Sequence, residues 1–163
     1  MRRQLIYLDH ITDKLMIRLS TIHTGLVVAF CVILNLALSI IFSTLLFPGI
    51  SNALKFSSLP EELVTVVLVA PIIETWIIQG YILQQCLRLS GSNKFVAILL
   101  SAMVFSLIHI YPFLTQALFT FFSGILFAVV YFASESKWKY PLIPVFIAHA
   151  LYNLIVMCLN HLL

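Results

Sequence analysis

Hydrophobic positions occupy most of this chain in long runs, and short polar stretches separate one run from the next. We expect five membrane-spanning helices, at approximately 22–47, 62–86, 94–111, 113–133 and 141–162. Each run is close to the ~20 residues that an α-helix needs to cross the hydrocarbon core of a bilayer. Lipid offers no hydrogen-bond partners to the backbone, so a spanning run must satisfy its peptide groups internally, as a helix does. The pattern therefore predicts an all-α fold, a polytopic transmembrane helix bundle.

The first twenty residues follow a different pattern, in which apolar side chains at helical spacing alternate with basic ones. The apolar positions are Leu5, Leu8, Ile11, Leu15 and Leu19, and the basic ones are Arg2, Arg3, Lys14 and Arg18. This alternation is typical of an amphipathic helix that lies in the membrane interface. We therefore expect an interfacial helix over residues 1–20, followed by a single transmembrane domain over residues 21–163.

Proline marks two expected boundaries along the runs. Tyr111-Pro112 is all that separates the third run from the fourth, and predicts a tight hairpin. Pro60 followed by Glu61 and Glu62 predicts a helix start, with exposed acids at the positive end of the helix dipole. His161, near the end of the chain, is expected at a membrane surface without a partner.

Composition and charge support the membrane assignment. Hydrophobic residues make up 62% of the 163 residues and charged residues only 9%, with a mean hydropathy of +1.10, whereas soluble domains carry roughly 25% charged residues. The net charge of +3 does not indicate nucleic-acid binding, because the basic residues stand beside apolar runs and form no patch. They precede the first run and flank the loops after the second and fourth runs. By the positive-inside rule, this places the N-terminus in the cytoplasm of a multi-pass cell-membrane protein.

Three ionisable side chains, Glu74, His109 and His149, fall well inside predicted spans, and such residues are candidates for function. Residues 63–83 contain no charged residue other than Glu74. Counted from the nearest basic residue at the cytoplasmic end of each helix, Glu74, His109 and Asn153 lie 14 or 15 residues deep, about 21–23 Å. His149 lies one turn closer to the cytoplasm. The four polar groups therefore share one layer of the membrane.

This layer has the composition of a hydrolytic site. His149 and Asn153 are four residues apart on one helical face, and Phe105 and His109 have the same relation. A carboxylate, two imidazoles and an amide can supply a general base and donors for an oxyanion. Two alternatives remain: Glu74, His109 and His149 could bind a catalytic zinc, although no HExxH spacing supports one, or the group could relay protons in a transporter.

Three short motifs carry a resemblance to a known family. "ETWIIQGY" at 74–81, "FSLIH" at 105–109 and "HALYN" at 149–153 resemble the ordered motifs EExxxR, FxxxH and HxxxN of the CPBP family. This family comprises the type II CAAX prenyl endopeptidases and bacteriocin-processing or immunity relatives. Each motif alone is weak, but three in order on separate predicted helices are specific. The resemblance covers approximately residues 60–163, the expected catalytic core.

The resemblance implies an intramembrane glutamate-dependent endopeptidase, and we favour a site without a cofactor over the zinc alternative. Glu74 matches the family's catalytic glutamate, which activates water together with the histidine that His109 matches. His149 and Asn153 match the pair that stabilises the oxyanion, and Phe105 is expected to pack around the site. The implied partners are the lipid bilayer and a peptide or lipidated protein substrate. Because the family includes immunity proteins, a non-catalytic role in binding a peptide in the same cavity stays open.

The chain departs from the family pattern at two positions. Thr75 and Gln79 stand where the family has its second glutamate and its arginine, which gives an ETxxxQ variant of the motif. Loss of one partner of a buried ion pair costs roughly 3–5 kcal/mol, whereas loss of both avoids an uncompensated charge. We therefore interpret the pair as a compensated replacement, and expect a neutral hydrogen bond between Thr75 and Gln79.

Overall fold

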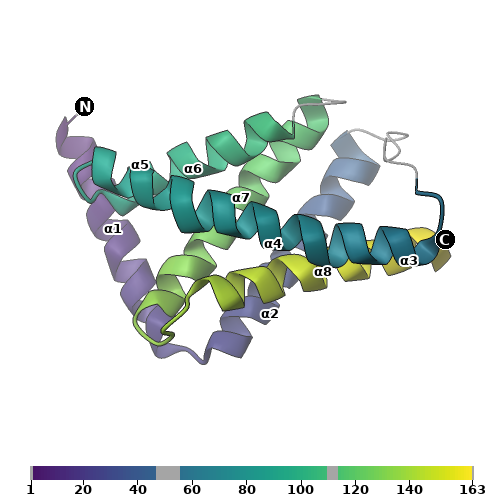
Figure 1. The fold of residues 1–163 in the computed structure, drawn as a ribbon. Helices are drawn as coiled ribbons and strands as arrows, with labels where there is room; N and C mark the ends of the chain where they lie inside the picture. The colour runs from purple at the N-terminus through teal and green to yellow at the C-terminus, as the bar shows by residue number, and fades with distance from the viewer. Residues whose placement is uncertain (1, 47–55, 110–113, 163) are drawn as a thin grey trace.

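A computed structural model describes residues 2–46, 56–109 and 114–162 of the chain, and within these ranges it contains helices and no strand (Figure 1). The predicted all-α bundle is therefore confirmed. The hairpin expected at Tyr111-Pro112 lies outside the described residues.

Four helical stretches are long and apolar enough to cross a membrane, which makes this a multi-pass membrane protein. They are Thr24–Leu46, Leu59–Leu89, Thr115–Glu135 and Leu142–Leu162. The first combines α2 (Thr24–Ile40) with the π-helical segment η1 (Ile41–Leu46), and the last two belong to α7 (Leu114–Glu135) and α8 (Leu142–Leu162).

The fifth expected span is shorter than the sequence pattern predicted. Helix α6 runs over Lys94–Ile108, 15 residues, or about 22 Å at 1.5 Å per residue. The helix ends at Ile108, and the N–H of His109 bonds the Ser106 carbonyl, three residues back, at 3.0 Å.

The second span is a continuous helix of mixed winding. It consists of α3 (Leu59–Glu62), η2 (Leu63–Val69), α4 (Ala70–Glu74), η3 (Thr75–Ile82) and α5 (Leu83–Leu89), in which η2 and η3 are π-helical. The predicted helix start is present: the helix begins at Leu59, directly before Pro60, and the Ser58 hydroxyl caps it by accepting the Glu61 N–H at 3.4 Å. Short π segments inside α-helices occur frequently at functional sites.

Helix α1 (Arg2–Thr21) lies across one end of the bundle, where α5 and α7 end and α6 and α8 begin (Figure 1). Its acids face α6: Asp13 forms a 3.0 Å ion pair with Lys94, and Asp9 accepts the Phe95 N–H at 3.3 Å. At the opposite end of α1, Lys137 donates a hydrogen bond to the Ile22 carbonyl. Helix α1 thus connects the turn between α5 and α6 to the turn between α7 and α8.

The outward side of α1, the segment predicted to be an interfacial helix, carries exposed apolar side chains. Leu8, Ile11 and Leu15 are exposed, whereas Met16 is buried against the bundle. Apolar side chains on one flank of a helix across the end of a membrane bundle can enter the lipid interface. Of the apolar positions that the sequence pattern grouped together, Leu8, Ile11 and Leu15 are thus exposed, whereas Leu19 packs against the buried core.

Helices α6 and α7 pack closely because Gly124 has no side chain at their crossing. A Cβ atom at Gly124 would lie 3.0 Å from the Cα of Ala102 and 3.1 Å from Cδ1 of Phe105. This crossing supports the end of α6 that carries Phe105 and His109.

We predict that Gly124→Ala lowers the stability of the protein by about 1–3 kcal/mol, because overpacking must displace backbone as well as side chain. The matched control is Gly80→Ala, where the new methyl group would meet the Cδ1 end of the Leu142 side chain at 3.2 Å. That side chain can move, and alanine favours helix by up to about 1 kcal/mol. Thermal unfolding in detergent measures both variants, and equal melting temperatures would contradict the prediction.

Candidate active site

Glu74 is the last residue of α4, a five-residue α-helical segment between the two π-helical segments. Its side chain is 23% exposed. The adjacent Ile72, Ile73 and Trp76 are all at least half exposed on the outside of the bundle. The helix therefore presents bulky apolar side chains outward and turns its one carboxylate toward the other helices.

His109 caps the C-terminal end of α6, with φ −106° and ψ 10°. The prediction that it lies well inside a span is wrong, because α6 ends one residue earlier. Its Nδ1 atom lies 2.8 Å from the carbonyl oxygen of Phe105. A carbonyl only accepts, so Nδ1 carries the hydrogen, and in the neutral ring Nε2 is the acceptor.

His149 lies on α8 and is 6% exposed. Its ring stacks on Phe127, with centroids 4.6 Å apart and an interplanar angle of 29°, and meets the Phe105 ring edge-on at 6.1 Å. Phe105 also contacts the His109 ring, at 4.6 Å. One buried aromatic side chain, Phe105, thus touches both imidazoles.

The structure brings Glu74, His109 and His149 together from three helices. Oε1 of Glu74 lies 3.7 Å from Nε2 of His109, and Oε2 lies 3.6 Å from Nε2 of His149. Both distances exceed those of a direct hydrogen bond. Each carboxylate oxygen therefore faces one imidazole nitrogen, and all of these atoms keep hydrogen-bonding capacity for another molecule such as water.

Asn153 is on the same face of α8 as His149, one turn further along the helix. Its Nδ2 atom donates a 2.8 Å hydrogen bond to the backbone carbonyl of Val66, in η2. One amide hydrogen of the predicted oxyanion donor is thus bound to the main chain.

Thr75 and Gln79 are both 2% exposed, but the hydrogen bond expected between them is absent. Oγ1 of Thr75 and Nε2 of Gln79 have no hydrogen-bond partner among the described residues. The expectation assumed the i, i+4 spacing of an α-helix, whereas the segment Thr75–Ile82 that holds both residues is π-helical. The segment thus buries two uncharged polar groups directly after Glu74.

The zinc alternative requires three ligands at one point. Within residues 2–46, 56–109 and 114–162, no three His, Cys, Asp or Glu side chains are placed to hold a metal ion. The absence of a cofactor stays a prediction from the resemblance.

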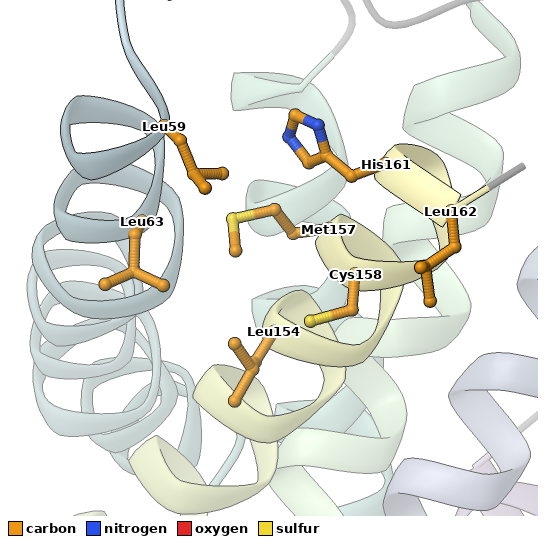
Figure 2. A pocket seen from close by; sticks show the side chains of 7 residues that line it. All are labelled: Leu59, Leu63, Leu154, Met157, Cys158, His161 and Leu162. Carbon is orange, nitrogen blue, oxygen red and sulfur yellow. The ribbon is translucent and has the colours of Figure 1, made fainter.

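An apolar groove of about 370 Å³ lies further along the seam between the second span and α8 (Figure 2). Leu59 and Leu63 line one side, and Leu154, Met157, Cys158, His161 and Leu162 line the other. Along both helices it lies beyond the Val66–Asn153 contact from Glu74, so the carboxylate does not line it.

His161, at this groove, has a partner that its sequence spacing does not indicate. Its Nε2 lies 2.8 Å from Oε2 of Glu62, which joins the start of the second span to the end of α8. The expectation of an unpaired histidine and a solvent-exposed acid is therefore wrong. The partners are 99 residues apart in sequence, so no local spacing could reveal them.

The helices and the cluster define an integral membrane protein with a carboxylate and two imidazoles meeting inside its bundle. The family model described as type II CAAX prenyl endopeptidase Rce1-like matches residues 56–155, more than half of the chain. The chain belongs to this family of membrane proteases, as its motifs indicated. No curated protein and no solved structure matches it.

Proposed function

We propose that this protein is an intramembrane endopeptidase that hydrolyses a membrane-associated peptide or lipidated protein with water activated by Glu74 and His109. The observation that carries the proposal is the cluster itself: each oxygen of Glu74, the only carboxylate in the middle of a span among the described residues, faces a histidine Nε2, at 3.7 and 3.6 Å. An ionisable residue at such a position is costly, so a structural role alone explains it poorly. The family match supports the same reaction class.

In this mechanism Glu74 is the general base. A water molecule near the carboxylate donates one hydrogen toward Glu74 and the other toward Nε2 of His109, whose Nδ1–H is held by the Phe105 carbonyl. The water oxygen attacks the carbonyl carbon of the scissile peptide bond while Glu74 takes its proton. The two acceptors thus orient one lone pair of the water toward the substrate.

His149 stabilises the charge that develops on the substrate oxygen. The attack converts the carbonyl into a tetrahedral oxyanion, and a donor placed at that oxygen lowers the barrier. Nε2 of His149 faces the same space as the carboxylate and is held rigidly by its stack on Phe127. Collapse of the intermediate breaks the C–N bond, and Glu74 returns its proton to the leaving nitrogen, which yields a carboxylate and an amine.

We expect His109→Ala to lower the rate of peptide cleavage by about 10²–10⁴-fold, because the water loses an acceptor that orients it. The measurement is cleavage by protein in liposomes, with products identified by mass spectrometry. An isoprenylated CAAX peptide and the same peptide without the lipid serve as substrates, and their comparison tests substrate class. The matched control is His10→Ala, an exposed histidine of α1. An unchanged rate in His109→Ala would overturn the role of His109.

A second candidate function is peptide binding without cleavage, as in an immunity protein. The departure at Thr75 and Gln79 favours it, because the family's second glutamate and arginine are both missing. In that case, binding of the peptide, or immunity to it, would survive the loss of Glu74. No cleavage product would form with any peptide.

We also propose that the end of the bundle at α1 faces the cytoplasm. Helix α1 and the turns that follow α5 and α7 lie together at that end (Figure 1). The described Lys and Arg residues are on α1 or in or next to these turns. They are Arg3, Lys14, Arg18, Arg88, Lys94, Lys137 and Lys139. This is the distribution that the positive-inside rule associates with a cytoplasmic face.

A further inference from the structure

The backbone hydrogen bonding of the second span is interrupted just before the segment that carries Glu74. In an α-helix the carbonyl of Val66 would accept the N–H of Ala70, four residues later. That N–H instead bonds the Thr65 carbonyl, five residues back, at the end of η2. The next candidate donor in the π register is residue 71, which is Pro71 and has no N–H. Neither the α nor the π register provides the Val66 carbonyl with a donor.

An unpaired carbonyl inside a membrane is unfavourable, because lipid cannot replace the missing donor. Asn153 provides it from α8, with Nδ2 at 2.8 Å from the Val66 oxygen. An aliphatic side chain at position 153 could not do so. The contact therefore requires a hydrogen-bond donor on α8 at the level of the Val66 carbonyl, which has no backbone donor of its own.

We propose that Asn153 is a positioning residue that locks α8 to the second span at the carbonyl left free by η2 and Pro71. This hydrogen bond between Asn153 and Val66, here called the lock, lies one helical turn from His149 on α8. On the second span it is eight residues from Glu74, about 12 Å along the helix. It fixes the register in which Nε2 of His149 meets Oε2 of Glu74 at 3.6 Å. This inference rests on the proposed function for its catalytic consequence, and differs from the oxyanion role that the resemblance implies.

The partner of the lock can be altered independently of Asn153. Pro71→Ala introduces an N–H that can reach the Val66 carbonyl, so the carbonyl no longer depends on α8. Under the proposal Asn153→Ala is harmful in the wild-type background and much less harmful in the Pro71→Ala background. A residue that contacts the oxyanion would be equally important in both.

The experiment measures the melting temperature in detergent and peptide cleavage in liposomes for Asn153→Ala, Pro71→Ala and the double variant. We expect Asn153→Ala to lower the melting temperature by roughly 3–10 °C and the cleavage rate by roughly 10²-fold. The double variant should recover most of both losses. There are two matched controls. Asn160→Ala changes an exposed amide on α8 and should have no effect. Pro144→Ala combined with Asn153→Ala should not rescue either loss.

Two results would overturn the proposal. One is additive loss of melting temperature in the double variant, which would mean that Asn153 does not serve the Val66 carbonyl. The other is recovery of the melting temperature without recovery of cleavage, which would favour direct contact with the oxyanion. A wild-type protein that cleaves no peptide would overturn the proposed function and the catalytic consequence, whereas non-additive melting temperatures would still support the lock.

Discussion

Glu74→Gln should abolish peptide cleavage while the protein still inserts and folds. The substitution preserves the size of the side chain and its hydrogen bonding, but an amide cannot take a proton from water. General-base catalysis contributes about 10²–10⁴-fold to a rate, and we expect a loss of at least that size in proteoliposomes. Folding is checked by the melting temperature in detergent.

The matched control for Glu74→Gln is Glu61→Gln, the same change on the same span. Glu61 is exposed at the helix start, where its carboxylate accepts hydrogen bonds from Ser57. Its substitution should leave cleavage unchanged. Full activity in Glu74→Gln would eliminate the proposed mechanism, and retained peptide binding or protection without any cleavage in wild type would favour the non-catalytic function.

Thr75→Glu should strongly destabilise the protein. Thr75 is 2% exposed and its hydroxyl has no partner among the described residues. A carboxylate in its place would be a buried charge without a counterion, which costs about 3–5 kcal/mol. The measurement is the melting temperature of the purified variant, together with the amount that inserts into the membrane.

Gln79→Arg should be harmful for the same reason with the opposite charge, because Gln79 is also 2% exposed. The double variant Thr75→Glu/Gln79→Arg restores the residues of the family motif and should recover much of the stability that each single variant loses. If Thr75→Glu alone were as stable as wild type, the interpretation of these positions as a compensated pair would be wrong.

The sequence determined the class of fold and the family. Its long apolar runs predict spanning helices because a backbone in lipid must bond to itself, and the alternation at the N-terminus predicts α1. Counting at a fixed rise per residue placed Glu74, His109 and His149 within about one turn of each other in depth, so a common layer could be expected before any contact was known, although α6 ends before His109. The three motifs then indicated the family that the match over residues 56–155 identifies.

Only the tertiary structure decided which polar groups meet. It turned the amide of Asn153 onto the Val66 carbonyl, paired Glu62 with His161, and left Thr75 and Gln79 without the hydrogen bond expected between them. These outcomes depend on π-helical winding and on the register between helices far apart in sequence. Hydrophobic periodicity specifies that a segment is a helix and which face is apolar. It does not specify the axial register of one helix against another. That register depends on side-chain packing and on single hydrogen bonds between helices, such as the one from Asn153.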